Sequence, residues 1–176
     1  MKKFIKFLLF LLLGVVSIGL ILMLLISKQY HFERSITING SQSEVYEYLK
    51  STKKFNEWNP WMKLDPSMSI QYSGNEGEVG DEYCWKDNKD VGVGCHEILQ
   101  LVPNQLQKTK MTFKEPFESI GYSDIILTPQ GNQTKVTWTL DCELDYPMNL
   151  MKIFMDQGMN KSYSEGLENL KKLVEN

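Results

Sequence analysis

His96 is the first candidate for acid–base chemistry in this sequence. It lies in the segment VGVGCHEIL and is one of only two histidines. An imidazole titrates near neutral pH, as a general base requires. Val91, Val93 and Leu99 occupy odd-numbered positions, so on a strand these apolar side chains would project from the face opposite to His96. Either face of this segment could therefore be buried. A catalytic role therefore stands beside a structural or solvent-exposed one.

Tyr122 and Asp124 are the second candidate. They stand two residues apart, so on one strand a phenol and a carboxylate project from the same face. If the turn at 129–132 places Asp124 opposite Trp138, both side chains face the interior, whereas a shift of one residue turns them to solvent. A solvent-exposed Asp124 is the default expectation. As the alternative, the pair completes, with His96, the set of candidate catalytic residues.

Other catalytic and metal-binding patterns are missing from the sequence. It contains no nucleophile elbow, phosphate-binding loop, dinucleotide-binding glycine pattern or HExxH motif. A zinc site made of Cys84, Cys95 and His96 lacks the paired ligand spacing of such sites, so we expect neither a metal nor a cofactor. Cys142 makes the number of cysteines odd, which defines no disulfide framework. A bridge between Cys84 and Cys95 is possible outside the cell if they lie on neighbouring strands of one hairpin, and the sequence leaves this open.

The segment FNEWNPW, Phe55–Trp61, contains two of the four tryptophans. Pro60 disfavours helical geometry in the residue before it, so a short helix should end at Asn59. Indole rings supply a large apolar area with few rotatable bonds. Trp58 and Trp61 could therefore line a ligand site or, alternatively, plug one end of a sheet.

Four methionines near the C-terminus repeat at steps of three and four residues, as one face of a helix requires. They are Met148, Met151, Met155 and Met159. Unbranched thioether side chains adapt to irregular apolar shapes, which suits a flexible ligand and equally an ordinary core. Gly158 and Gly166 lower the helix propensity and indicate either a close approach of helix and sheet or space for a ligand.

Strands must position most of these side chains. Runs rich in Val, Ile, Thr and aromatic residues, separated by short turn-like segments, predict antiparallel strands. The predicted strands are Tyr30–Ile38, Met68–Ser73, Gly80–Lys86, Val91–Leu101, Gln105–Phe113, Ser119–Thr128 and Thr134–Glu143. In the last strand Val136, Trp138, Leu140 and Cys142 alternate with polar residues, so this face should be buried.

Three helices complete the expected domain. Ser41 and Glu44 match a capping box, which predicts a helix from there to about Lys50. A second short helix is expected at Lys53–Trp58. Residues from Pro147 to about Val174 form one long amphipathic pattern, because proline suits the first turn of a helix and no helix breaker follows.

The segment Phe7–Ile26 is uncharged and apolar, and at 1.5 Å per residue it spans about 30 Å, the thickness of a bilayer's hydrocarbon core. It is longer than the apolar region of most signal peptides, which are the alternative, and no cleavage motif follows it. Three lysines precede it, and fewer net positive charges follow, so the N-terminus should be cytoplasmic and the domain outside. We expect an anchor with a short tether at residues 1–29 and one domain at 30–176.

The charge distribution argues against a nucleic acid partner. All 22 acidic residues follow the apolar segment, whereas three of the 19 basic residues precede it. The domain is therefore more acidic than the whole chain, whose formal net charge is −3. Such a surface repels polyanions.

The order of strand, two short helices, six strands and one long helix resembles the helix-grip fold. The sequence is similar to the START-related superfamily called SRPBCC, in its polyketide cyclase/dehydrase-like branch, which includes members with one N-terminal membrane span. The resemblance is carried by ERSITIN (Glu33–Asn39), FNEWNPW (Phe55–Trp61), YSG (Tyr72–Gly74), VGVG (Val91–Gly94), EPF (Glu115–Phe117), TKVTW (Thr134–Trp138) and GLENLKKLVE (Gly166–Glu175). It covers nearly all of residues 30–176 and concerns the fold rather than the chemistry.

This resemblance implies an α+β domain in which a curved seven-stranded antiparallel sheet wraps around the long C-terminal helix and leaves a cavity. It implies that Gly94, His96 and Ile98 face the cavity and that the segment Phe55–Trp61 forms one end of it. The candidate ligand-binding residues are then Trp58, Trp61, His96, Trp138, Met148, Met151, Met155 and Met159.

The leading interpretation is a membrane-anchored domain that binds a small hydrophobic or lipid-like molecule and is not an enzyme. One alternative is an enzyme of the cyclase or dehydratase type that moves protons with His96 or with Tyr122 and Asp124. Another is a protein-interaction module whose cavity is filled by side chains. The sequence determines neither the ligand nor the oligomeric state.

Overall fold

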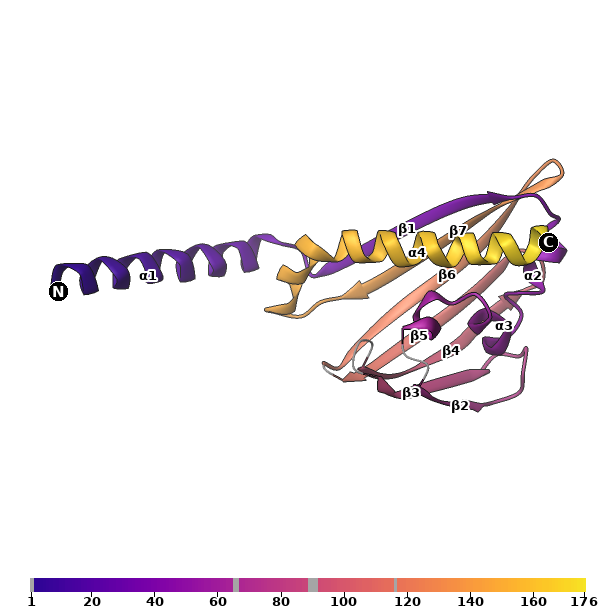
Figure 1. Cartoon of the computed structure of the whole chain (residues 1–176), viewed down its shortest axis with the longest axis horizontal. Helices are drawn as coiled ribbons and strands as arrows, with labels where there is room; N and C mark the ends of the chain where they lie inside the picture. The colour runs from indigo at the N-terminus through magenta and orange to yellow at the C-terminus, as the bar shows by residue number, and fades with distance from the viewer. Residues whose placement is uncertain (1, 65–66, 89–91, 116) are drawn as a thin grey trace.

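The structure is a computed structural model that describes residues 2–64, 67–88, 92–115 and 117–176 (Figure 1). The elements follow the order α1 (Lys2–Leu25), β1 (Gln29–Ile38), α2 (Gln42–Tyr46), α3 (Thr52–Asn56), η1 (Pro60–Lys63), β2 (Ser69–Ser73), β3 (Glu82–Asn88), β4 (Gly92–Val102), β5 (Leu106–Glu115), β6 (Ser119–Gln130), β7 (Gln133–Glu143), η2 (Met148–Met151) and α4 (Lys152–Glu175). The predicted element order is therefore confirmed, although the predicted strand start at Val91 lies outside the described residues.

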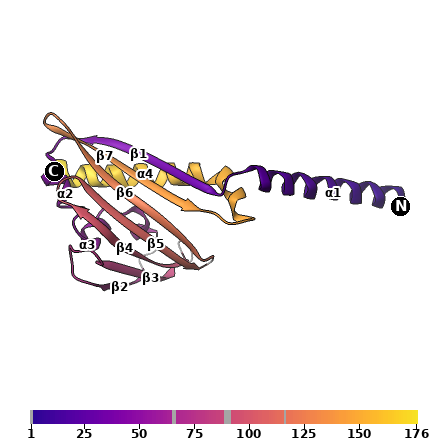
Figure 2. The same ribbon diagram turned by 180° about the vertical axis from the view of Figure 1, so that it is seen from behind.

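The seven strands form one curved antiparallel sheet in the order β1-β7-β6-β5-β4-β3-β2. From β2 to β7 each strand pairs with the next along the chain, and β1 closes against β7. Helix α4 and the short helices cover one face of the sheet, and no helix of the described residues covers the other face (Figures 1 and 2). This arrangement confirms the α+β helix-grip fold.

Strand β7 shows how the sequence pattern produces the buried face. Val136, Trp138 and Leu140 are buried in the core, and Cys142 packs against it half-buried. The polar residues between them face away from α4, where Thr137 Oγ1 and Ser35 Oγ share a hydrogen bond of 2.9 Å. The predicted alternation of β7 is confirmed.

Local side-chain caps fix the short helices. Ser41 caps α2 by accepting a hydrogen bond from the Glu44 amide, and the Glu44 carboxylate accepts one from the Ser41 amide, which confirms the capping box. Ser51 caps α3 through its side chain, which accepts a hydrogen bond from the Lys54 amide. The Asn59 side chain accepts a hydrogen bond from the Trp61 amide and starts η1. The Ser51 cap precedes the FNEWNPW segment, and the Asn59 cap lies within it.

The last helix begins later than the sequence predicts. Residues Met148–Met151 form the 3₁₀ turn η2, and α4 runs from Lys152 to Glu175. Its C-terminal half is packed tightly, with Tyr163, Gly166 and Leu170 buried. Its first turn leaves large apolar side chains exposed. The C-terminal half of α4 therefore packs closely against the sheet, whereas its N-terminal half lies over the sheet without close packing.

Helix α1 projects from the end of the domain at which η2 lies (Figure 1). Its segment Lys3–Leu25 is long and apolar enough to cross a membrane, a test that a signal sequence also passes. The Asn149 side chain donates hydrogen bonds to the carbonyl oxygens of Met23 (2.7 Å) and Ile26 (2.8 Å), at the end of the helix where carbonyl groups lack partners within the helix. This contact fixes the end of α1 next to η2.

Candidate ligand-binding cavity

A cavity of about 1110 Å³ lies between the sheet and the first half of α4. Its inner end is lined by buried residues. Its mouth consists of exposed or half-buried residues from the adjoining ends of β5 and β6 and the turn between them, from the end of β7 and the loop after it, and from η2. The inner end includes Phe55, Asn59, Tyr83, His96, Ser123, Trp138 and Tyr163. The mouth is formed by Lys114, Glu115, Phe117, Glu118, Ile120, Glu143, Asp145, Met148 and Met151. The predicted cavity between helix and sheet is present and is not filled by side chains.

The two tryptophans of the FNEWNPW segment have different positions. Trp58 is completely buried, and its Nε1 donates a hydrogen bond of 3.0 Å to the carbonyl oxygen of Tyr48. It is not among the residues that line the cavity, and its position matches the alternative in which an indole fills the end of the sheet. Trp61 does line the cavity, edge-on to Trp138 at 5.9 Å between ring centroids. Trp58 lies in the turn after α3, whereas Trp61 lies on η1, which turns the second indole toward the cavity.

All four methionines of the predicted stripe line the cavity. Met155 and Met159 lie on α4 and are half-buried, whereas Met148 and Met151 lie on η2 at the mouth. Flexible thioether side chains therefore cover one wall from the mouth inward, where they can adapt to ligands of different shape. Trp138 also lines the cavity, with its ring stacked on Tyr163 at 4.0 Å.

His96 faces the inner end of the cavity, as the family resemblance implies. The buried residues on β4 are Gly94, His96 and Ile98. The His96 ring lies 4.8 Å from the ring of Phe55 and 5.3 Å from that of Tyr83. This burial lowers the pKa of His96 to about 4, and the negative charge of Asp81 opposes the shift only in part. The imidazole is therefore neutral at pH 7.

Tyr122 and Asp124 lie on the outer face of the sheet. In the observed register Ile125, and not Asp124, is opposite Trp138. The Asp124 carboxylate is 3.2 Å from Lys108 Nζ on the outer face, and Tyr122 is half exposed. The register differs by one residue from the one that would turn these side chains into the cavity, so the solvent-facing position that the sequence left open is the one observed.

The other polar groups at the inner end are hydrogen-bonded within the protein. Ser123 Oγ accepts a hydrogen bond from Trp138 Nε1 (2.9 Å) and donates one to the carbonyl oxygen of Thr139 (2.7 Å). Asn59 Nδ2 donates to the Tyr83 hydroxyl at 3.1 Å. In contrast, Nδ1 of His96 is completely buried without a partner in the part of the chain that the structure describes. His96 is thus the unsatisfied polar group of the inner end.

The charges of the cavity are confined to its mouth. Four carboxylates lie there, on Glu115, Glu118, Glu143 and Asp145, beside one lysine, Lys114. No charged side chain lines the inner end among the described residues, since His96 is neutral at pH 7. A charged ligand at the inner end would lose its contact with water and would find no opposite charge there. Burial of such an unpaired ion is costly.

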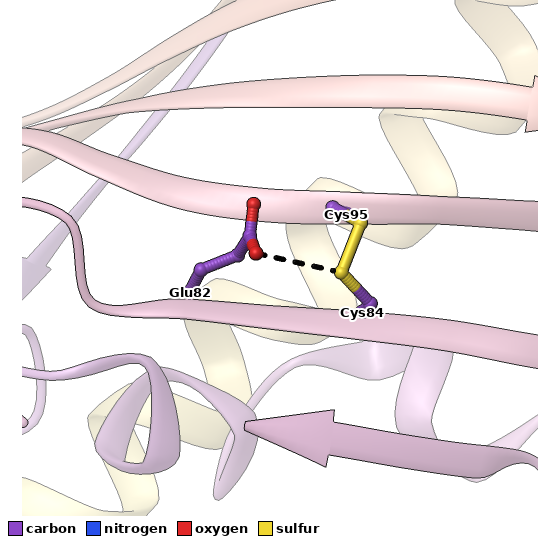
Figure 3. Close-up of side chains that lie close together, drawn as sticks. All are labelled: Glu82, Cys84 and Cys95. Carbon is purple, nitrogen blue, oxygen red and sulfur yellow. Dashed lines mark hydrogen bonds between the residues drawn. A yellow bond between two sulfur atoms is a disulfide. The ribbon is translucent and has the colours of Figure 1, made fainter. Parts of the chain in front are cut away.

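Cys84 and Cys95 lie directly opposite each other on β3 and β4 and form a disulfide (Figure 3). The Glu82 carboxylate approaches Cys84 Sγ to 3.6 Å. These three side chains are close enough together to hold a metal ion, but sulfur atoms bonded to each other are not thiolate ligands. The bridge that the sequence left open is therefore present, and it links β3 to β4.

Several wall residues were not among the sequence candidates. They include Phe55, Tyr83, Trp85, Met111, Phe113, Leu140 and Tyr163. Most lie on strands at alternate positions, so the strand pattern held the necessary signal once the inner face of each strand was known. A second hollow lies between the capping box and the β6–β7 turn, where polar loop residues such as Ser41, Glu44 and Gln133 line it. It opens widely to solvent and cannot enclose an apolar ligand.

A curved antiparallel sheet that is closed by a C-terminal helix over an apolar cavity defines a helix-grip domain of the ligand-binding type. Residues 29–175 match the family described as polyketide cyclase/dehydrase and lipid transport, and the chain belongs to this family. No curated protein sequence matches the chain significantly.

Solved structures support the same fold. Mll3558 from Rhizobium loti has a TM-score of 0.61 at 18% identity, over 82% of this chain and 96% of that one. TTHA0849 from Thermus thermophilus has a TM-score of 0.60 at 17% identity, over 82% and 97% of the two chains. Ara h 8.0201 has a TM-score of 0.61 at 14% identity, over 84% and 99%. At these identities the similarity concerns the fold alone.

Proposed function

We propose that this protein is a membrane-anchored domain that binds a small hydrophobic or lipid-like molecule in the cavity between the sheet and α4. The observation that carries the proposal is the cavity itself, with a volume of about 1110 Å³ and walls made largely of aromatic and methionine side chains. Ligand sites are typically apolar hollows of about 300–1,000 Å³ with a few polar groups. A cavity of this size in a small domain leaves many apolar groups without packing partners unless a ligand supplies them.

The position of α1 supports an exchange of ligand with a bilayer. The β5–β6 turn, η2 and the end of α1 lie at one end of the domain, whereas α2 and the C-terminus lie at the other (Figures 1 and 2). The mouth of the cavity therefore lies on the side from which α1 projects. Because only three residues separate α1 from β1, a bilayer around α1 would stand close to this mouth.

Contacts between the tether and the mouth keep the two together. Lys28 Nζ is 2.6 Å from an Asp145 carboxylate oxygen and lies above the ring of Tyr146. Lys152 Nζ donates a hydrogen bond of 3.1 Å to the carbonyl oxygen of Ser27 and another to that of Gln29. Each exposed ion pair is weak, but together with the Asn149 contacts they define one arrangement of the anchor.

Exposed apolar side chains surround the mouth on the same side. Phe117, Ile120 and Met151 line it and are about half exposed, and Ile153 and Phe154 follow on the first turn of α4. The exposed fraction of Phe154 is 79%. Large exposed apolar groups next to a membrane anchor favour contact with the bilayer interface.

We place the domain on the outer side of the membrane, with the N-terminus in the cytoplasm. The lysines before α1 support this orientation. The Cys84–Cys95 disulfide supports it independently, because such bonds persist in oxidising compartments. We propose no reaction, since His96 is the sole candidate catalytic residue that lines the cavity.

Native mass spectrometry of the full chain, released from detergent after extraction from membranes, tests the proposal. We expect a bound species of lipid-like mass in a one-to-one ratio. Gly121 lines the cavity, so the variant Gly121→Phe should reduce the bound fraction severalfold. The matched control is Gly158→Phe, because Gly158 lies on α4 with open space around its α-carbon. Repeated spectra of the empty chain would overturn the proposal.

A further inference from the structure

The inner end of the cavity contains one buried polar side chain that the protein does not satisfy. The His96 side chain is 3% exposed, and Nδ1 is completely buried without a hydrogen-bond partner. The described residues offer no hydrogen bond to either nitrogen of this ring. Buried polar groups in folded proteins are nearly always hydrogen-bonded, so an unsatisfied one requires an explanation.

Neighbouring side chains do not provide the missing partner. The rings of Phe55 and Tyr83 pack against the imidazole, and the Tyr83 hydroxyl accepts its hydrogen bond from Asn59. The Asp81 carboxylate accepts hydrogen bonds from Thr52 Oγ1 at 2.6 Å and from two backbone amides. His96 also lines the cavity, so a molecule in the cavity can form a hydrogen bond with the imidazole.

We propose that His96 is the polar subsite of the cavity and that the ligand is an uncharged amphiphile with a hydroxyl group bound to the imidazole. This inference rests on the proposed function. It adds the chemical class of the ligand, a long-chain or ring alcohol, whose apolar part lies along the methionine wall.

The hydroxyl follows from the donor and acceptor capacity of the ring. A neutral imidazole has one nitrogen that donates and one that accepts, and a hydroxyl can do either. A carboxylate can only accept, and it would have to be buried beside Phe55 and Tyr83 without a cation. The one lysine of the cavity, among the described residues that line it, is Lys114, which lies at the mouth beside four carboxylates. The cavity therefore selects against fatty acid anions.

Three probes of equal chain length separate these classes: hexadecan-1-ol, hexadecanoate and hexadecane. Each is added to the full chain in lipid nanodiscs, and the bound fraction is measured by native mass spectrometry for the wild type and for His96→Phe. Because each probe is compared between two proteins in the same bilayer, its partition into lipid cancels. The matched control is His31→Phe, the same substitution at the other histidine, which lies exposed outside the cavity.

We expect hexadecan-1-ol to bind about tenfold more weakly to His96→Phe, the effect of one hydrogen bond worth about 1.4 kcal/mol. Hexadecane should bind equally to both proteins, and His31→Phe should behave as the wild type. The variant His96→Gln keeps a donor and an acceptor and should retain part of the preference for the alcohol. In addition, the ¹⁵N resonances of the His96 ring should move when the alcohol is added, while those of His31 stay in place.

Other outcomes overturn the inference in distinguishable ways. If the alcohol and the alkane bind with similar affinity and His96→Phe changes neither, the subsite is wrong while the proposed binding function stands. If hexadecanoate binds best and depends on His96, the ligand is charged and the inference is wrong. If none of the three probes binds the wild type, the proposed function fails as well.

Discussion

Two glycines of α4 provide a matched test of how this helix is held by the sheet. A Cβ atom added to Gly166 would lie 2.8 Å from a ring carbon of Trp138 and 3.1 Å from Cδ of Pro60. A Cβ atom added to Gly158 would meet no atom within 4 Å. Both positions are in the same helix, so Gly166→Ala and Gly158→Ala change the helix propensity alike and differ in packing.

The expected magnitudes follow from these contacts. Replacement of glycine by alanine stabilises a helix by about 1 kcal/mol, so Gly158→Ala should raise the free energy of unfolding by about that amount. At Gly166 the new methyl group meets a buried indole stacked on Tyr163, which cannot rotate away, and overpacking of this kind costs about 1–3 kcal/mol. Gly166→Ala should therefore lower the free energy of unfolding by about 1 kcal/mol. The difference of about 2 kcal/mol between the two variants isolates the packing of the helix against the sheet.

Thermal unfolding of the full chain in detergent, followed by tryptophan fluorescence, measures this difference. For a chain of this size 1 kcal/mol corresponds to a shift of about 2–4 °C in Tm, so the two variants should move Tm in opposite directions. If both variants are stabilised to the same extent, α4 does not lie against Trp138, and the reasoning about the grip of sheet and helix is refuted.

Three further predictions concern the bridge, the buried histidine and the anchor. Replacement of both Cys84 and Cys95 by serine should lower the free energy of unfolding by about 3 kcal/mol, because the bridge closes a short loop; urea titration of the variant and of the reduced wild type should give equal losses, and an unchanged midpoint would contradict the bridge. The pKa of His96 is about 4 in the folded protein against 6.5 in the unfolded chain, so between these values only the unfolded chain binds the proton. The free energy of unfolding should thus fall as the pH is lowered from 6.5 to 4, by up to about 3 kcal/mol relative to His96→Phe, and parallel pH profiles of the two proteins would show that the ring is not buried. Asn149→Ala removes two hydrogen bonds to the end of α1, each worth about 1 kcal/mol. Amide hydrogen exchange at the end of α1 should therefore accelerate more than tenfold, and an unchanged exchange rate would show that Asn149 does not hold the end of α1.

Local sequence signals were sufficient for the elements of the fold. The Ser41–Glu44 capping box and the alternation in β7 each depend on a few neighbouring residues, and both are present as expected. Gly158 and Gly166 indicated either a close approach of helix and sheet or space for a ligand; Gly166 faces the Trp138 ring, whereas Gly158 has open space around it. Such features can be predicted because a period or a cap is contained within one segment.

Which residues line the cavity depends on how segments that are distant in the sequence pack against each other. A single sequence does not contain this information. The face on which Tyr122 and Asp124 lie stayed open in the sequence, because a strand register that differs by one residue inverts every side chain. Trp58 and Trp61 are three residues apart with the same chemistry, yet Trp58, in the turn after α3, is buried in the core, while Trp61, on η1, lines the cavity. The inward position of His96 came from the family resemblance, since apolar residues occur at both parities of its strand.

The most direct test of ligand binding in the cavity is photo-crosslinking with a C16 lipid chain that carries a diazirine at its middle. The full chain in nanodiscs is irradiated with this probe, and the labelled peptides are identified by mass spectrometry. We predict labelled residues on α1 and, in addition, on the first half of α4 and on β5 and β6. Labelling of α4, β5 and β6 should fall severalfold in Gly121→Phe but not in Gly158→Phe. Labelling that is confined to α1 in all three proteins would contradict the account.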